Sequence, residues 1–243
     1  KIHLLLKRRF RAHLPVSAPY TRANLQRMMA RYRMLYIKPQ NSSLGKGIMK
    51  LTRLPQRRWH IKSAYRSAAV PQAAAVRTVQ RRVGRRAYMI QQGIPLARYL
   101  GRVYDIRVTV QRGGDGAWRV AGMLGRVANR GHHVTNLAQG GLVRRVDVLL
   151  AHSFARPQRV VAAVRRLALA IAHHLGSRLR NLADIGLDIG VDRSGKPYFI
   201  ELNCRALRKG YEKAGMRDTL RQVYGNPMHY AGRILHARRG GGR

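Results

Sequence analysis

Residues 186–203 have the sequence Gly-Leu-Asp-Ile-Gly-Val-Asp-Arg-Ser-Gly-Lys-Pro-Tyr-Phe-Ile-Glu-Leu-Asn, which predicts two short apolar strands joined by a polar Ser-Gly turn. Because side chains alternate along a strand, Glu201 and Asn203 share one face. A two-residue turn would place Asp188 directly opposite Glu201, and a four-residue turn would place it one diagonal step away. In either register all three side chains point to the same side.

Asp188 and Glu201 need a positive partner, because like charges that face each other across a ladder are destabilising. A cation between Asp188 and Glu201 would remove that repulsion. Two carboxylates and the Asn203 amide supply only oxygen ligands, which suit a hard ion such as Mg²⁺. The alternative is a surface hairpin whose acids pair with nearby Arg side chains, and this stretch alone leaves both interpretations open.

Acidic residues are rare in this chain, so chance alone would seldom place two of them on one face of the hairpin. The 243 residues include 49 Lys and Arg but only 9 Asp and Glu, and Glu occurs only at Glu201 and Glu212. The length allows one large domain or two small ones. A hydrophobic content of 45% indicates a globular chain rather than a disordered one.

The formal net charge of +40 favours anionic partners. Nucleic acid, anionic cell-surface polymers and ATP are candidates, whereas a compositional drift towards Arg would give the same charge without any function. Only 3 Phe and 2 Trp are present, so stacking platforms for single-stranded nucleic acid are scarce.

The lone cysteine and the lack of long apolar runs limit the class of protein further. Cys204 cannot form an internal disulfide or a multi-cysteine metal site. No run is long enough for a membrane-spanning helix and no signal peptide is evident, so we expect a cytoplasmic protein with no membrane partner. The chain begins at Lys1, which leaves a preceding segment open.

Apolar periodicity and turn residues predict a mixture of helices and antiparallel strands, the α+β class. Helices are expected after the capping Thr21 to about Tyr32, over Ala73–Val83 and from Pro157 to about Leu175, with further helical, basic sequence after the hairpin. Strands are expected over Met34–Lys38, Ile48–Leu51, Trp59–Ile61, Tyr88–Gln92, Asp105–Gln111 and Trp118–Val127.

A loop with the sequence Gly45-Lys46-Gly47 is suited to cradling phosphate, because Gly lets backbone amides approach an anion closely. It is not a Walker A loop, since no Ser or Thr follows Lys46 and a strand rather than a helix comes next. The arrangement predicts a flap between two strands, with Lys38 at its base. A plain hairpin loop is the alternative.

Two charged side chains share a face of the strand that contains Asp105 and Arg107. Arg126 lies on the expected partner strand. These residues either form a structural ion pair, which is common, or aim guanidinium groups at a phosphoryl group in transfer.

Two histidine pairs, His132-His133 and His173-His174, are poor metal candidates, because adjacent side chains seldom point at one ion. Thr135 and Asn136 are better candidates, as neutral hydrogen-bond partners for a phosphate or a substrate.

Taken in order, these segments resemble the ATP-grasp superfamily, and within it the YheC/YheD-like branch. The resemblance extends over roughly residues 14–235. The matching segments are Tyr36-Ile37-Lys38-Pro39, Ser43-Leu44-Gly45-Lys46-Gly47-Ile48, Ile90-Gln91-Gln92, Asp105-Ile106-Arg107, Arg126, Thr135-Asn136, Asp188 and Glu201-Leu202-Asn203.

The resemblance implies a nucleotide held between two α+β lobes and a role for each matching position. The implied ATP-binding residues are Lys38, Ser43, Gly45, Lys46, Gly47, Ile90, Gln91, Gln92, Asp105 and Thr135. Of these, Ile90, Gln91 and Gln92 would form the hinge that recognises adenine through backbone groups. The implied catalytic residues are Arg107, Arg126 and Asn136, and the implied Mg²⁺ ligands are Asp188, Glu201 and Asn203.

The resemblance also implies three regions. These are an N-terminal helical segment, 1–30, the remnant of a larger domain; an ATP-grasp domain, 31–235, divided into a flap lobe (31–92) and a catalytic lobe (93–235); and a basic Gly-rich tail, 236–243. The chain departs from many relatives, because Arg98 or Arg102 stands where they have a Lys after the hinge, and Arg has a different geometry.

The reaction implied is ATP-dependent ligation, in which a carboxylate is phosphorylated and an amine then attacks the acyl phosphate. The carboxylate and amine substrates are not defined by the sequence. The resemblance also implies association with the spore coat. The alternative is a non-catalytic protein on the same fold that binds polyanions or nucleic acid.

Overall fold

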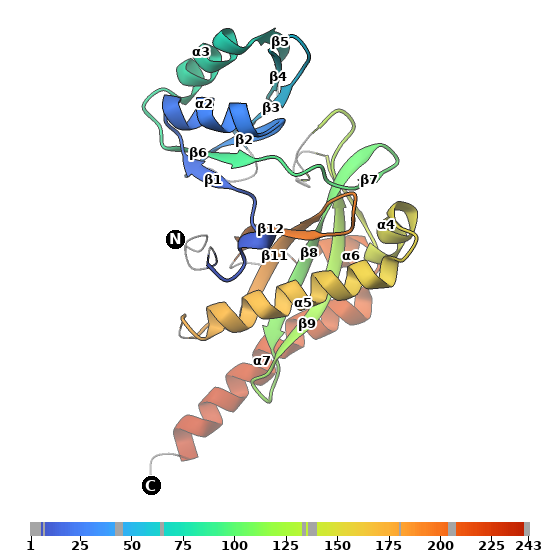
Figure 1. The fold of residues 1–243 in the computed structure, drawn as a ribbon. Helices are drawn as coiled ribbons and strands as arrows, with labels where there is room; N and C mark the ends of the chain where they lie inside the picture. Colours follow the sequence, from blue (N-terminus) through green and yellow to red (C-terminus); the bar gives the residue numbers. More distant parts are fainter. Residues whose placement is uncertain are drawn as a thin grey trace.

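The computed structural model describes residues 6, 8–41, 46–63, 66–132, 135, 140–179, 181–203 and 208–240, with side chains to residue 237, and they form two lobes (Figure 1). Each lobe contains an antiparallel sheet with six described strands. The strand order is β1-β6-β2-β3-β4-β5 in the N-terminal lobe and β10-β9-β8-β11-β12 in the C-terminal lobe, where β7 also pairs with β8.

The described chain contains both strands and helices. The strands are β1 (Ser17–Pro19), β2 (Met34–Pro39), β3 (Met49–Arg53), β4 (Arg58–Lys62), β5 (Ser67–Pro71), β6 (Tyr88–Gln92), β7 (Arg98–Tyr99), β8 (Arg102–Arg112), β9 (Trp118–Val127), β10 (Leu142–Arg144), β11 (Asp184–Val191) and β12 (Pro197–Asn203). The helices are η1 (Arg11–His13), α2 (Arg22–Arg31), α3 (Gln72–Val83), α4 (Val146–Ser153), α5 (Pro157–Gly176), α6 (Lys209–Lys213) and α7 (Arg217–Gly240).

Helices α2 and α3 cover one face of the N-terminal sheet and enclose its core (Figure 1). Alternate residues of the strands, such as Leu35, Ile37 and Ile90, are fully buried against these helices. The intervening residues, including Tyr36 and Lys38, are only partly buried. Period-two alternation therefore gives this sheet an apolar face towards the helices and a polar face away from them.

Residues before β2 contribute to both lobes. Leu6, Phe10 and Leu14 are buried in the core of the C-terminal lobe. Leu25 and Met29, on α2, are buried in the core of the N-terminal lobe. The first part of the chain therefore ties the two lobes together.

Helix α2 begins with a side-chain cap. The Oγ1 atom of Thr21 accepts a hydrogen bond of 3.0 Å from the backbone N–H of Asn24. Thr21→Ala is expected to lower the free energy of unfolding by about 1 kcal/mol, because that N–H loses its partner. Urea denaturation measures the change, and Thr21→Ser, which keeps the hydroxyl, is the control. Equal stability of all three proteins would contradict the role of the cap.

The C-terminal sheet is covered on both faces. Helices α4 and α5 pack on one face over the larger core, and α6 and α7 pack on the other (Figure 1). Tyr104, Ile106, Val108 and Val110 on β8 all point towards the larger core. The residues between them on β8 are polar and point to the other face.

A bulge in β12 decides which side chains of the hairpin face the core. Asp188 pairs with Glu201, but the next residue, Ile189, pairs with Phe199, so Ile200 is an extra residue. Regular alternation would put Phe199 and Glu201 on one face. The bulge instead lets Phe199 enter the core while Glu201 points to the opposite face.

The α+β class and the expected main elements agree with the structure. Neither expected turn is found, because the hairpin turn has three residues between the paired Asp192 and Lys196. The direct pairing of Asp188 with Glu201 is nevertheless present, since the bulge absorbs the difference. The short strands β1, β5, β7 and β10 and helix α4 were not predicted. In the described part of the chain, no helix is both long and apolar enough to cross a membrane.

Candidate functional site

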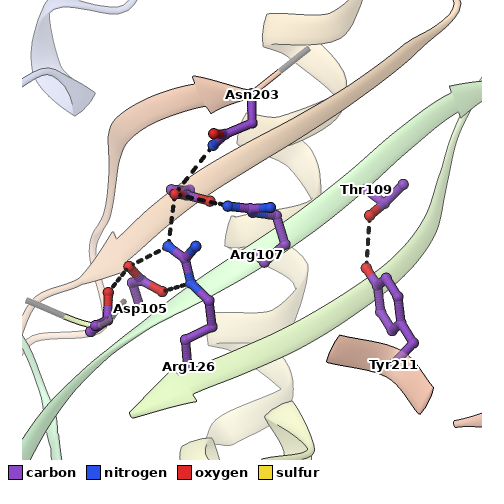
Figure 2. Close-up of polar contacts among 8 residues, drawn as sticks. Asp105, Arg107, Thr109, Arg126, Asn203 and Tyr211 are labelled. Atoms are coloured by element: carbon purple, nitrogen blue, oxygen red, sulfur yellow. Dashed lines mark hydrogen bonds and ion pairs between the residues drawn. The ribbon is translucent and has the colours of Figure 1, made fainter. Parts of the chain in front are cut away.

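A row of buried polar side chains runs along one face of β8. Thr109 and Gln111 are fully buried, and Asp105 and Arg107 are 4% and 9% exposed. The Thr109 hydroxyl lies 2.8 Å from the hydroxyl of Tyr211 on α6, as Figure 2 shows. Gln111 donates to a backbone carbonyl of α7. Helices α6 and α7 thus provide partners for one end of the row, and the end with Asp105 and Arg107 needs others.

An ion-pair network satisfies that end of the row. Nη2 of Arg126, on β9, lies 2.7 Å from Oδ2 of Asp105 and 2.7 Å from Oδ2 of Asp188. Arg107 forms a second ion pair with Asp188, through Nε and through Nη2 at 3.2 Å. Figure 2 shows Arg107 and Arg126 converging from neighbouring strands. Two guanidinium groups and two carboxylates therefore form one buried, neutral cluster.

Burial makes the charged groups of this cluster strongly dependent on one another. Desolvation raises the pKa of Asp105, and the opposing effect of Arg126 is smaller. Burial alone would lower the pKa of Arg126, but Asp105 and Asp188 raise it above its ordinary value. Each charge is stable here only because its partners are present. Thr135 also donates its hydroxyl to Asp105.

Glu201 differs from the other two acids. It lies opposite Asp188 in the β11–β12 ladder, but it is exposed and forms no hydrogen bond or ion pair with the described residues. Restricted hydration of its carboxyl group raises its pKa, and the negative charge of Asp188 raises it further. The Asn203 amide donates to Oδ2 of Asp188 over 3.3 Å. Glu201 is therefore a carboxylate open to a further cation.

Lys38 reaches this region from the polar face of the N-terminal sheet. Its Nζ donates a 2.6 Å hydrogen bond to Oε1 of Gln91, whose amide nitrogen donates to Ser17. Burial lowers the pKa of Lys38, whereas the carboxylate of Glu201 raises it. The two lobes therefore bring opposite charges, Lys38 and Glu201, to the same region.

Further cations share the face of Lys38 and were not predicted as site residues. The ladder pairs Tyr36 with Lys50 and Lys50 with Lys62, so these side chains lie on one face. Burial lowers the pKa of Lys50, and the positive charges of Arg98 and Lys62 lower it further. The period-two pattern of the strands is the signal that would have identified Lys50. A polyanion beside this face would remove the repulsion.

The expected Mg²⁺ ligands fit a hard cation in their chemistry and position. Asp188, Glu201 and Asn203 bring oxygen atoms to one face of one hairpin, and Glu201 has no competing partner among the described residues. Both oxygens of Asp188 already accept from guanidinium groups, so a metal ion would share this carboxylate with Arg107 or Arg126. Among the described residues, no group of three or more His, Cys, Asp or Glu side chains could hold a metal ion, so a site here would need the Asn203 amide or non-protein ligands.

The other expected site residues occupy different environments. Lys46 and Gly47 lie in the loop before β3, where Gly47 has a φ of +76° and a Cβ atom there would lie 3.2 Å from Pro39. Ser43, Gly45 and Asn136 lie outside the described residues. Ile90 is fully buried in the core, and β6, which contains Gln91 and Gln92, pairs with β1 on one side and β2 on the other.

The pairing of β6 matters for the expected contact with adenine. The backbone N–H of Gln92 donates to Val16, and that of Gly93 donates to Met34. Sheet pairing therefore occupies much of the backbone of the expected hinge.

The sequence of this chain matches a known protein family and a known relative. The YheC/D like ATP-grasp family matches residues 1–234. The endospore coat-associated protein YheD of Bacillus subtilis is 30% identical over 183 residues, which cover 72% of this chain. The chain spans only 40% of the length of YheD.

Solved structures show the same fold at low identity. They include the C-terminal domain of K. lactis Pby1, an ATP-grasp enzyme (TM-score 0.53, 14% identity, 93% of this chain and 72% of that chain), and D-cycloserine synthetase DcsG (0.54, 13%, 88% and 66%). An L-amino acid ligase from Bacillus licheniformis is also similar (0.51, 14%, 87% and 41%). The match over nearly the whole sequence, together with this fold, shows that the chain belongs to the YheC/D-like ATP-grasp family.

Proposed function

We propose that this protein is an ATP- and Mg²⁺-dependent ligase that joins a carboxylate to an amine. The observation that supports this most strongly is the distribution of charge between the lobes. The N-terminal sheet presents Lys38 and Lys50 on one face, and the C-terminal lobe presents the carboxylate of Glu201, which has no hydrogen-bond or ion-pair partner among the described residues. A magnesium–triphosphate complex has negative oxygens for the first surface and a cation for the second.

The binding site for ATP follows from this arrangement. Lys38 and Lys46 would contact the phosphates, with Ser43, Gly45 and Gly47 in the flap beside them. The end of β6, after Gln91 and Gln92, would receive the adenine ring. Asp188, Glu201 and Asn203 would hold Mg²⁺, which would neutralise phosphate charge.

The buried arginines would then serve the transfer itself. Arg107 and Arg126 are held in place by Asp188 and Asp105, so their positive charge is fixed before the substrate arrives. Preorganised charge of this kind stabilises negative charge that develops in a transition state. Asp105 is a positioning residue in this account, because its carboxylate contacts Arg126 and Thr135. Asn136 is the remaining candidate for a contact with the substrate.

The proposed reaction has two balanced steps. A carboxylate oxygen attacks the γ-phosphorus of ATP, the bond to the bridging oxygen breaks, and ADP leaves. An amine then attacks the acyl carbon, inorganic phosphate leaves, and the nitrogen loses a proton as the amide forms. The protein contributes positioning and charge neutralisation, which together account for most catalysis of phosphoryl transfer.

ADP release with a panel of amino acids and short peptides tests the proposed function. We expect ADP and phosphate to appear in equal amounts only when a suitable carboxylate and a suitable amine are both present. Mass spectrometry should then detect a product with the mass of both substrates minus water. ADP release that is independent of any carboxylate would contradict the proposed reaction class.

A further inference from the structure

A second concave site lies on the N-terminal lobe, between α2 and α3. It is a cavity of about 740 Å³ whose lining includes Arg22 on α2, Arg57 in the β3–β4 turn, and Arg77 and Arg81 on α3. The helices cover one face of the N-terminal sheet (Figure 1), and this face is the apolar one. Lys38 lies on the polar face. The sheet therefore separates this cavity from the proposed ATP site.

The positive charge of the cavity has no counterpart nearby. No Asp or Glu precedes Asp105 in the sequence, so the N-terminal lobe has no acid of its own. In the part of the chain that the structure describes, the guanidinium groups of Arg22, Arg57, Arg77 and Arg81 form no hydrogen bond or ion pair. Four like charges around one cavity favour a ligand with several negative groups.

The backbone fixes one of these arginines in an uncommon conformation. Arg57 has a φ of 53°, which is rare for residues other than Gly. Its carbonyl accepts a 3.1 Å hydrogen bond from the N–H of Gln72, the first residue of α3. The turn is thereby joined to the start of α3, and Arg57 is held beside the arginines of that helix.

The rest of the lining suits a peptide better than a nucleic acid. Gln26 and Gln80 offer amide groups that can both donate to and accept from a peptide backbone, whereas a phosphodiester offers only acceptors. Ala73 and Val76 add an apolar surface for side-chain methylenes. None of the described residues that line the cavity is aromatic, so they offer no platform on which unpaired bases could stack.

We propose that the cavity between α2 and α3 binds an acidic segment of a partner polypeptide, whose carboxylates pair with Arg22, Arg57, Arg77 and Arg81. The 243 residues include only 9 acids and no acidic run, so they do not supply this segment themselves. The proposal is independent of the ligase function, since the two sites lie on opposite faces of the N-terminal sheet.

Fluorescence anisotropy with a labelled hexaglutamate peptide tests this proposal. The pocket variant replaces Arg57, Arg77 and Arg81 with Gln, and the control variant replaces Arg159, Arg165 and Arg166, which are exposed on α5. Both variants lose the same net charge. Near-physiological salt, with a Debye length of about 8 Å, screens the general field of the protein. A labelled hexathymidylate and a hexaglutamine peptide are the comparison probes.

We expect the pocket variant to bind hexaglutamate about tenfold more weakly than wild type, because three partly exposed ion pairs are lost. The control variant should change the affinity by less than about threefold, and hexaglutamine should not bind. Equal losses in both variants would overturn the proposal, as would no binding of hexaglutamate to wild type. If hexathymidylate binds more tightly than hexaglutamate, and only the pocket variant loses this binding, then the ligand of the cavity is a nucleic acid and not an acidic peptide.

Discussion

Replacing Glu201 with Gln is expected to remove about half of the thermal stabilisation that ATP confers in the presence of Mg²⁺, while the free protein stays as stable as wild type. A ligand at a concentration of 100 Kd stabilises a protein by about 2.7 kcal/mol, and a tenfold loss of affinity removes about 1.4 kcal/mol of this. Gln keeps the shape of Glu201 but not its charge, so the metal ion would lose an anionic ligand.

The stability of the free Glu201→Gln protein follows from the surroundings of this carboxyl group. Its pKa is raised by the restricted hydration of the carboxyl group and by Asp188, so the folded protein favours the neutral form of Glu201 more than the unfolded chain does. A neutral isostere therefore does not weaken the fold at neutral pH. Glu212→Gln is the matched control, because Glu212 is the only other Glu and is exposed on α6. If ATP shifts the unfolding temperature equally in all three proteins, Glu201 does not contribute to the ATP site.

Arg126→Gln is expected to lower the free energy of unfolding by about 3–5 kcal/mol, the cost of leaving buried charges without their partner. Asp105 would lose its guanidinium partner, and Asp188 would keep Arg107 and the Asn203 amide. These carboxylates are almost fully buried, so water cannot replace the lost contacts. Urea denaturation at neutral pH measures the change.

An exposed ion pair in the same lobe supplies the control for Arg126. Arg119 pairs with Asp115 in the β8–β9 hairpin, where both side chains are more than half exposed. Arg119→Gln should cost only about 0–1 kcal/mol. A similar cost for the two substitutions would contradict the account of a desolvated cluster.

The cost of Arg126→Gln should also decrease towards acidic pH. Burial already raises the pKa of Asp105 in the folded state, and loss of Arg126 removes an influence that lowers it. The folded variant therefore binds a proton at Asp105 more readily than the unfolded chain, and its stability relative to wild type rises as pH falls through that raised pKa. Denaturation curves at neutral and mildly acidic pH measure the difference.

The sequence was sufficient to predict the features that depend on local patterns. Thr21 before an apolar period of 3.6 predicted the start of α2, and the alternation around Asp105 and Arg107 predicted the polar face of β8. Both follow from the geometry of a single helix or strand. The shared face of Asp188 and Glu201 is also present in the structure.

Features that depend on tertiary packing were not predictable in the same way. The bulge at Ile200 exists because Phe199 packs in the core below α5, and no local pattern marks it. The sequence left open whether a metal ion or Arg accompanies Asp188 and Glu201. The structure pairs Asp188 with arginines from β8 and β9 and leaves Glu201 without a partner among the described residues. Predicting this arrangement requires knowledge of the strand order. Strand β1 is short and ends at Pro19, so its pairing with β6 depends on the surrounding lobe.

Calorimetric titration of the wild-type protein with ATP, in excess Mg²⁺ and in EDTA, tests the central claim most directly. The claim is that the Glu201 face of the hairpin binds a metal ion that is already complexed with nucleotide. We expect the affinity for ATP to fall by about tenfold or more in EDTA, and we expect this dependence on Mg²⁺ to disappear in Glu201→Gln. Equal affinity for ATP with and without Mg²⁺ in the wild-type protein would contradict the claim.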